Sequence, residues 1–513
     1  MTHKKWMIMV YMAGDNNLSE SMAGQIKDFG NLLWNSIGRP EKPMDIAVLV
    51  YFDGSNPNTP TFFCDFTDQD KPRIEVKPDS NSADSRSLGR FIGWCHRRYK
   101  AEHTALFLSG HSDGFQGISL LRDESAGKAM EISDLRKTLE NSVKRNGKKL
   151  DVLCFDSCLM SMVEIAYEFR KAADILVASQ GLFPMSGLDY RNAFFDLINN
   201  PDTEPKDWAV ELVNWYIKSQ QIYSLGGRSV TLSAINLGNQ DSSQLGEIQS
   251  DDSPNRNFPL DNLISKINEL SSWLLSILEP SKVLKSILSD KSLNEIETKK
   301  QLEYKTNLME KLKRMLLSAQ WKSQSFLFEQ AVDIQDFAYK LAQECEFFGE
   351  EFNELKDICY DLALISDSCL ISYASSGADY KNARGLSLFF PWSFVGYSIS
   401  AQAYQSLELF KGDEPLNQWN EFLNLYLGII TMSNTNWKVD PFDFAASNPQ
   451  FSLAENFNSF IDNEHRVGGQ LRVGGQLRGM NAFLEYFCRY KNLSPVPVEE
   501  LINELQNSRV NDI

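Results

Sequence analysis

Cys158 has the side chain of a nucleophile and lies between a short apolar run and a helical pattern. Residues Leu150–Phe155 form an apolar run of strand length, and the apolar residues from Leu159 to Ala166 recur at the spacing of one helix face. This order predicts a strand, a sharp turn at Cys158, and a helix. Unpaired N–H groups at a helix N-terminus favour the thiolate, which is the nucleophilic form of cysteine. Most single cysteines are small buried hydrophobic residues, and Cys154 is expected to be one.

His111 is the histidine best placed to act with Cys158. It follows the run His103–Gly110, at a Gly-containing turn, whereas the other histidines have polar or Arg/Lys-rich neighbours. We expect those four at the surface: His3, His96, His103 and His465. In an open α/β sheet, active sites form at the carboxyl ends of the strands. Two such ends, one with His and one with Cys, predict a catalytic dyad, although a lone Cys and a lone His can also be unrelated.

The surrounding sequence alternates between strand and helix patterns, which predicts a parallel sheet with helices on both faces. Apolar runs predict strands at 6–13, 45–53, 61–66 (an edge strand), 104–110, 150–155, 174–180 and 230–237. Helical spacing predicts helices at 19–36, 87–99 and 132–142, then at 260–288, 296–318, 325–342 and 352–365. Two strands, Cys369–Ser375 and Gly385–Phe390, are expected to return to the sheet, followed by one or two helices in 401–430.

Length and charge limit the possible classes of protein. A chain of 513 residues accommodates two to three domains, and a formal charge of −17 argues against nucleic acid or an anionic membrane as a partner. Eight cysteines without a close-pair framework are expected to be reduced thiols, as in the cytoplasm. The apolar run near the N-terminus is expected to be a buried strand rather than a signal peptide, and no stretch reaches membrane-spanning length.

Five segments of the sequence resemble the clostripain-like cysteine peptidases, in the clan of caspases, gingipains and legumain. They are WMIMVYMAGDNN at Trp6–Asn17, Phe91–Gly110, FDSCLMSMVE at Phe155–Glu164, VASQGLFPMSGLDY at Val177–Tyr190 and ARGLSLFFP at Ala383–Pro391. The resemblance implies a caspase-like, doubly wound α/β/α sandwich with a mainly parallel sheet, followed by a helical C-terminal region. We expect a catalytic domain at 1–240, a helical region at 241–367, returning strands and helices at 368–430, and an extension at 431–513.

The resemblance also implies roles for individual residues. Cys158 would attack the scissile carbonyl, His111 would give a proton to the leaving amine, and the backbone N–H groups of Ser112 and Cys158 would hold the oxyanion. Asp156 matches the acidic residue of the family's specificity pocket, which would favour Arg over Lys in the substrate. Its position also allows a turn or helix-capping role. Ser179 and Asp189 are further candidates for substrate binding, and no third catalytic residue can be assigned.

Two departures from the family pattern lie close to these residues. Gly-His-Ser-Asp-Gly replaces the usual Asp-His-Gly-Ser-Gly, and Gln180-Gly181 replaces a frequent Glu-Glu. Both leave the dyad intact. The second removes negative charge near the pocket, so the sequence supports peptide cleavage more strongly than it supports a preference for basic residues. Asp189 would compensate for that charge. Calcium dependence occurs in the family, yet no EF-hand-like pattern supports it here, and no cofactor or metal ligand is predicted.

A latent form is expected, released by a cut or by an activating protein partner. Relatives are cut in the interval that corresponds to Leu121–Met130, where Lys128-Ala129 is the best-placed bond and Arg122-Asp123 the second; a plain surface loop is the alternative. A tandem RVGGQL repeat lies at 466–477 and is followed by Arg478-Gly479. We expect it to be a recent duplication without function or, alternatively, a basic loop that occupies the enzyme's own acidic cleft. The competing functional hypothesis is a catalytically idle relative, with the helical half as its binding surface.

Overall fold

The computed structural model describes residues 2–34, 45–55, 60–67, 72–77, 80–117, 119–221, 224, 228–238, 259–279, 295–326, 330–411 and 416–433. The predicted extension at 431–513, with its RVGGQL repeat, therefore lies almost wholly outside the described residues. Most of the predicted loop at 239–259 lies outside them as well.

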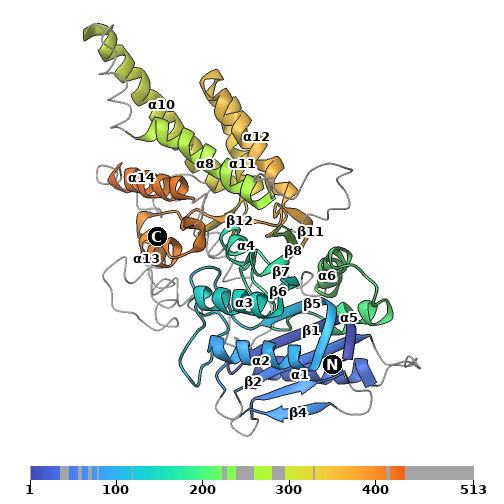
Figure 1. Ribbon diagram of the computed structural model, residues 1–513. Helices are drawn as coiled ribbons and strands as arrows, with labels where there is room; N and C mark the ends of the chain where they lie inside the picture. The colour runs from blue at the N-terminus through green and yellow to red at the C-terminus, as the bar shows by residue number, and fades with distance from the viewer. Residues whose placement is uncertain are drawn as a thin grey trace, which may run out of the picture.

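A nine-stranded sheet forms the centre of the molecule, in the order β11-β8-β7-β6-β5-β1-β2-β3-β4 (Figure 1). Its five central strands are parallel: β1 (Thr2–Gly14), β2 (Ile46–Gly54), β5 (Tyr99–Ser109), β6 (Leu150–Asp156) and β7 (Ala173–Ala178). Antiparallel strands complete both edges: β3 (Phe62–Asp65) and β4 (Arg73–Val76), and β8 (Val230–Asn236) and β11 (Leu370–Ser376). The predicted mainly parallel sheet is confirmed.

Alternate side chains of β1 pack into two separate hydrophobic cores, one on each face of the sheet, as expected for a strand buried on both sides. Met7, Met9 and Tyr11 pack with α2 (Ser85–Arg98), α3 (Ile132–Asn146) and α4 (Val163–Phe169). Trp6, Ile8 and Val10 pack on the other face with α1 (Ser19–Trp34), α5 (Tyr190–Asn199) and α6 (Pro205–Ser219). Helices on both faces confirm the doubly wound arrangement, whereas the sequence analysis had not predicted α5 and α6.

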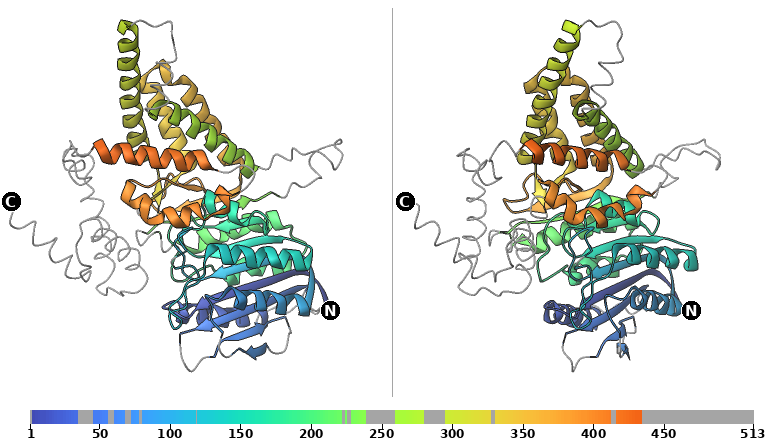
Figure 2. Two further views of the ribbon diagram at one scale, coloured as in Figure 1. Left: turned by 60° about the vertical axis from the view of Figure 1, so that its left-hand side comes forward. Right: turned by 90° about the vertical axis from the view of Figure 1, so that its left-hand side faces the viewer.

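The C-terminal half is helical, with α8 (Pro259–Leu278), α10 (Glu295–Lys322), α11 (Ile334–Phe348), α12 (Asn353–Ser368), α13 (Phe394–Gln405) and α14 (Asn417–Ser433). Helices α8, α10, α11 and α12 extend away from the sheet (Figure 2). Within the described ranges, no helix is both long and apolar enough to span a membrane.

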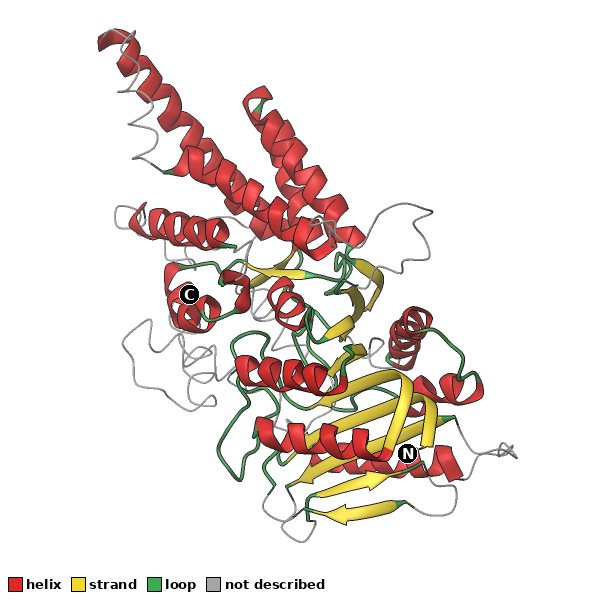
Figure 3. Ribbon diagram, in the orientation of Figure 1, coloured by secondary structure: helices red, strands yellow, loops and turns green. Residues whose placement is uncertain are grey.

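Two predictions for this half are wrong in part. The predicted helix at 325–342 begins as two short strands, β9 (Ser325–Phe326) and β10 (Ala331–Asp333), and only then continues as α11. These strands pair with β12 (Ser387–Phe389) in a separate three-stranded sheet (Figure 3). The segment Gly385–Phe390 therefore does not return to the central sheet, although β11 does. Short apolar runs do not reveal which sheet they join, because the pairing depends on distant partners.

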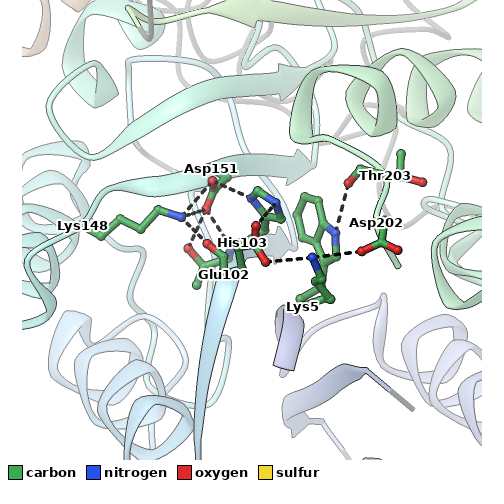
Figure 4. Close-up of polar contacts among 9 residues, drawn as sticks. Lys5, Glu102, His103, Lys148, Asp151, Asp202 and Thr203 are labelled. Atoms are coloured by element: carbon green, nitrogen blue, oxygen red, sulfur yellow. Dashed lines mark hydrogen bonds and ion pairs between the residues drawn. The ribbon is translucent and has the colours of Figure 1, made fainter. Parts of the chain in front are cut away.

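A polar cluster lies at the amino ends of β1, β5 and β6 (Figure 4). His103 Nδ1 is 3.2 Å from Asp151 Oδ1, and the Nζ of Lys148 is 2.9 Å from Asp151 Oδ2. The pKa of Asp151 is low despite its burial, because His103, the Thr104 N–H and Lys148 all favour the carboxylate. The side chain of His103 is 14% exposed, so the prediction that it lies at the surface is wrong.

His96, near the end of α2, is partly exposed. Burial, together with the nearby charge of Lys100, lowers the pKa of His96 to about 4. Both His96 and His103 belong to the end of the sheet opposite to Cys158, so neither is a partner for it.

Candidate active site

The carboxyl ends of β5 and β6 bring His111 and Cys158 to one edge of the sheet. Ser109 and Asp156 are paired in register as the last residues of these parallel neighbours. His111 and Cys158 each follow two residues later. Neighbouring strands lie about 4.8 Å apart, so equal offsets place both loops side by side. The Ser112 hydroxyl joins them by donating to the Cys158 carbonyl.

Gly114 shows how closely the two loops pack. Its φ is +70°, a value that L residues with side chains rarely adopt. A Cβ at this position would lie 2.9 Å from Met162 Sδ and 3.1 Å from the Leu159 carbonyl oxygen. A glycine is therefore needed for the histidine loop to rest against the segment that follows Cys158.

The chain does not enter a helix directly after Cys158. Leu159 has a φ of +62°, and α4 begins only at Val163. The intervening residues bond to neighbouring segments instead, since the Leu159 N–H donates to the Gly181 carbonyl over 3.0 Å and the Ser161 N–H to the Ser179 carbonyl over 2.9 Å. The predicted helix start at Leu159 is wrong, and Cys158 has no helix N-terminus to favour its thiolate.

The Cys158 thiol is held in its neutral form. Its sulfur accepts a hydrogen bond from the Phe183 N–H over 3.2 Å. Burial nevertheless raises the pKa of Cys158 to about 11, and the negative charges of Asp156 and Asp113 act in the same direction. A thiol in this state is a poor nucleophile at neutral pH.

Residues from the C-terminal half cover the cysteine. Phe326, Tyr380 and Ala383 form one small apolar cluster with Cys158 and Leu159. The Tyr380 ring rests on the backbone of Gly181, where an added Cβ would overlap it. The Leu182 N–H also faces the Tyr380 hydroxyl at 3.5 Å. These residues therefore cover Cys158 in part, and its exposure is intermediate.

His111 has a side-chain partner that the sequence analysis did not identify. Its Nε2 lies 2.6 Å from the Oδ1 of Asn17, in the turn after β1. Strand β1 is the other neighbour of β5, with Met12 and Ser109 in register. The Gly-Asp-Asn-Asn run after the first predicted strand was the signal in the sequence that could have pointed to Asn17.

Two backbone N–H groups face no partner at the junction of the loops. Among the described residues, neither the Ser112 N–H nor the Cys158 N–H donates a hydrogen bond. Both belong to the adjoining loops that carry His111 and Cys158. Unengaged N–H groups beside a nucleophile have the chemistry of an oxyanion-binding pair.

Asp156 is buried and fully engaged. It is 4% exposed, and its carboxylate accepts hydrogen bonds from Ser109 Oγ at 2.8 Å, Tyr190 OH at 2.8 Å and the Leu188 N–H at 3.0 Å. Burial raises its pKa, while these donors act in the opposite direction. Helix α1 holds the covering loop, because Gln25 Nε2 donates to the Ser186 carbonyl over 2.7 Å. The carboxylate is therefore shut off from a substrate in this conformation.

The other two predicted substrate-binding residues differ in accessibility. Ser179 is fully buried, and its Oγ lies 2.9 Å from Thr231 Oγ1. Asp189 is partly exposed and caps α5, because its carboxylate accepts from the N–H and from the Nδ2 of Asn192. Of the two, only Asp189 lies near the surface of the loop beside Cys158.

Gln180, at a position where the family often has a glutamate, links the central sheet to the C-terminal half through two side-chain hydrogen bonds. Its Nε2 donates to Asp333 Oδ2 over 2.9 Å, and its Oε1 accepts from the Gly385 N–H over 2.8 Å. An amide fits between a carboxylate and an N–H group, whereas a glutamate would face Asp333 with a second negative charge. The contact with Asp333 therefore explains why this chain has Gln180 where the family often has a glutamate.

The loop Leu121–Met130 ends in an exposed hairpin turn. Asp123 and Lys128 exchange backbone hydrogen bonds of 2.9 and 3.1 Å, and residues 124–128 are exposed. Lys128 is thus accessible. The Arg122-Asp123 bond is not, because Asp123 is 3% exposed and the Arg122 carbonyl accepts from Asn16 Nδ2 over 2.8 Å.

Among the described residues, no group of three His, Cys, Asp or Glu side chains is placed to hold a metal ion. The seven cysteines of this part of the chain are free thiols.

Comparison with known proteins agrees with this arrangement. A sequence model of the clostripain family matches residues 10–419. Clostripain from Hathewaya histolytica is 25% identical in an alignment 227 positions long that covers 37% of this chain and 42% of that protein, so the chain matches less than half the length of this relative.

Two solved structures share the fold. An inactive protease zymogen from Parabacteroides distasonis superposes with a TM-score of 0.50 at 18% identity, over 80% of this chain and 98% of its own. A secreted cysteine protease from Bacteroides thetaiotaomicron, solved with an irreversible peptide inhibitor, superposes with a TM-score of 0.50 at 15% identity over the same shares. With a family match that runs from the first strand to the last described helix, the chain belongs to the clostripain family, which confirms the resemblance and the caspase-like α/β fold.

Proposed function

We propose that the chain is a cysteine endopeptidase with Cys158 as nucleophile and His111 as its acid and base. The observation that carries this proposal is the equal offset of the two residues from the register pair Ser109 and Asp156, on neighbouring parallel strands. That geometry brings a thiol and an imidazole to one edge of the sheet, with unengaged N–H groups beside them.

The reaction would proceed by acyl transfer. The Cys158 proton passes to His111, and the sulfur bonds to the scissile carbonyl carbon. The N–H groups of Ser112 and Cys158 hold the oxyanion. His111 then protonates the leaving amine as the C–N bond breaks, and water hydrolyses the thioester with His111 as its base.

We further propose that the enzyme cleaves after basic residues, Arg before Lys. Asp156 ends strand β6, two residues before Cys158. Asp189 directly precedes α5, at the end of the loop that starts at Gly181. Because Leu188 and Tyr190 now occupy the Asp156 carboxylate, the loop from Gly181 to Asp189 must move before a guanidinium can reach it. Protein or peptide segments with exposed basic residues are the expected substrates.

The closed state supports a latent form. The high pKa of the Cys158 thiol and the cover of Tyr380 and Phe326 both oppose attack on a substrate. A cut after Lys128 is the proposed release, with an activating protein partner as the other route. The hairpin is joined to the turn that carries Asn17, because the Glu124 N–H donates to the Asp15 carbonyl over 2.8 Å.

The same closure also favours a second candidate, a catalytically idle relative that binds partners through its helical half. In that case the neutral thiol would be permanent. The two candidates differ in one property, since only a peptidase acquires a reactive Cys158 after treatment that opens the site.

A substrate-profiling experiment tests the proposal. The protein, before and after limited proteolysis, is incubated with a diverse peptide library, and the new termini are identified by mass spectrometry. We expect cleavage after Arg and, less often, after Lys, abolished in Cys158→Ala and in His111→Ala. Intact libraries from treated and untreated protein would favour the idle relative.

A further inference from the structure

We propose that Asn17 is a positioning residue for His111, which extends the catalytic pair to a Cys-His-Asn set. This inference rests on the proposed peptidase function. The Oδ1 of Asn17 lies 2.6 Å from His111 Nε2, a distance at the short end for hydrogen bonds between nitrogen and oxygen. An amide oxygen only accepts, so the Nε2 of His111 carries the proton in this contact.

With the Asn17 amide oxygen facing Nε2, the inference assigns the chemistry to the other ring nitrogen, Nδ1. With the proton of neutral His111 on Nε2, the lone pair is on Nδ1. Nδ1 therefore takes the Cys158 proton, and the imidazolium keeps its Nε2–H bonded to Asn17. After the sulfur–carbon bond forms, Nδ1 returns this proton to the leaving amine as the C–N bond breaks, and the ring regains its starting tautomer.

The contacts of Asn17 differ from those of its neighbour Asn16. Asn16 stabilises the backbone, because its Nδ2 donates to the carbonyls of Ala13 and Arg122, and its Oδ1 accepts from the Leu18 N–H. Asn17 bonds through its side chain to His111, while its Nδ2 is buried without a partner among the described residues. A buried amide group without an acceptor costs free energy, so stability does not account for this residue.

The position of Asn17 follows from the sheet. Strand β1 is the neighbour of β5 on the side away from β6, and the turn after β1 therefore flanks the histidine loop. The Asn16 N–H donates to the Gly14 carbonyl over 2.7 Å, which keeps this turn tight. Asn17 and Cys158 thus approach His111 from the two neighbouring strands.

Two substitutions separate a positioning role from a structural one. Asn17→Ala removes the acceptor, and Asn17→Asp keeps its size while adding a negative charge, which favours the imidazolium. In the activated enzyme we expect Asn17→Ala to lower kcat about 10- to 100-fold, with KM changed less than twofold. The alkaline limb of the pH profile, where the imidazolium loses its proton, should move to lower pH in Asn17→Ala and to higher pH in Asn17→Asp.

Asn16→Ala is the matched control. It removes hydrogen bonds from the same turn, so its melting temperature should fall without a displacement of the alkaline limb. If Asn17→Ala does not fold, the displacement in Asn17→Asp decides the question alone. An active wild-type enzyme with unchanged kcat and pH limbs in both Asn17 variants would overturn the inference, while leaving the proposed function intact.

A measurement independent of turnover completes the test. Protein labelled with ¹⁵N-histidine is titrated by NMR, and the His111 signals are assigned from their loss in His111→Gln. We expect the neutral ring to carry its proton on Nε2, and Asn17→Asp to raise the pKa of His111. A proton on Nδ1, or the same pKa in both proteins, would contradict the positioning role whether or not the protein cleaves peptides.

Discussion

Phe183 donates its backbone N–H to the Cys158 sulfur over 3.2 Å, and this bond links Cys158 to the loop that covers the Asp156 carboxylate. Five residues later in the same loop, the Leu188 N–H donates to Asp156 Oδ1 over 3.0 Å. One loop therefore contacts both the Cys158 sulfur and the Asp156 carboxylate. Movement of this loop is the step that we expect to turn the resting protein into a working enzyme.

Removal of the Tyr380 ring should make Cys158 more reactive in the uncut chain. The ring rests on Gly181 and belongs to the apolar cluster around Cys158. In Tyr380→Ala, more solvent reaches the partly covered sulfur, and the pKa of Cys158 should fall from about 11 because burial is the main cause of that value. Iodoacetamide labelling of Cys158, followed by mass spectrometry between pH 7 and 10, should be faster and should begin at lower pH.

Tyr304→Ala is the control for this experiment, since Tyr304 is 56% exposed on α10. It should label at the wild-type rate. Gly181→Ala provides a second route to the same opening, because the added methyl group displaces the ring. Equal labelling rates in all four proteins would show that Tyr380 does not cover the thiol.

Loss of the Asp156 charge should abolish the preference for basic residues. Asp156→Asn leaves a substrate guanidinium without a partner, at an expected cost of about 3 to 5 kcal/mol in transition-state binding. The measurement is kcat/KM for matched peptides with Arg, Lys or Gln before the scissile bond.

Ser109→Ala is the matched control, because it removes one donor to Asp156 and keeps the carboxylate. Its preference for Arg should persist. Equal use of Arg and Gln peptides by the wild-type enzyme would instead assign Asp156 a purely structural role beneath the loop. A preference lost in Asp189→Asn and kept in Asp156→Asn would move the charge recognition to Asp189.

Self-cleavage is expected at the exposed end of the hairpin, after Lys128. Purified protein is incubated, separated under denaturing conditions and sequenced from each new N-terminus. We expect a terminus at Ala129, absent in Cys158→Ala and in Lys128→Ala, and present in Arg122→Ala. Because the two fragments contribute the neighbouring strands β5 and β6 to one sheet, they should elute together without denaturant. Full activity in an uncut chain would exclude this cut as the switch.

Glu164 should make the contact between the sheet and the C-terminal half sensitive to pH. This side chain of α4 is fully buried, and its Oε1 accepts from the Phe389 N–H at 2.9 Å and from Tyr404 OH at 3.2 Å. Burial raises its pKa from 4.5 to about 7. The cost of ionising it in the folded protein is therefore absent below pH 4.5, grows up to pH 7 and is constant above.

Glu164→Gln keeps the shape of the protonated side chain and removes this cost. Relative to the variant, the wild-type protein should lose about 3 kcal/mol in its free energy of unfolding between pH 4 and 8. Urea unfolding of both proteins across this range measures the difference. A difference that does not change with pH would show that folding leaves the pKa of Glu164 at its ordinary value of 4.5.

The central sheet could be predicted from the sequence because its strands are apolar runs separated by helical patterns. The positions of His111 and Cys158 followed from the same pattern, since each comes just after a strand. The turn after Cys158 could not be predicted in this way. Leu159 adopts a left-handed conformation because residues 159–161 bond to segments far along the chain, and local periodicity carries no information about such partners.

The contacts that cover Cys158 and Asp156 could not be predicted from the sequence either. The cover over Cys158 comes from Tyr380 and Phe326, which lie more than one hundred residues away in the chain. Asp156 was placed correctly at the end of a strand, but its burial depends on Leu188 and Tyr190. The Asn17 contact with His111 likewise requires that β1 and β5 be neighbours, which is a property of the folded sheet.

The most direct test of the account is covalent capture of the nucleophile. The protein, cut after Lys128 or left intact, is treated with a peptidyl-arginine acyloxymethyl ketone, and the adduct is located by mass spectrometry of its peptides. We expect one adduct per chain, on Cys158, formed much faster after the cut and absent in Cys158→Ala. No adduct in either form, or an adduct on another cysteine, would contradict the assignment of Cys158 as the nucleophile of a peptidase.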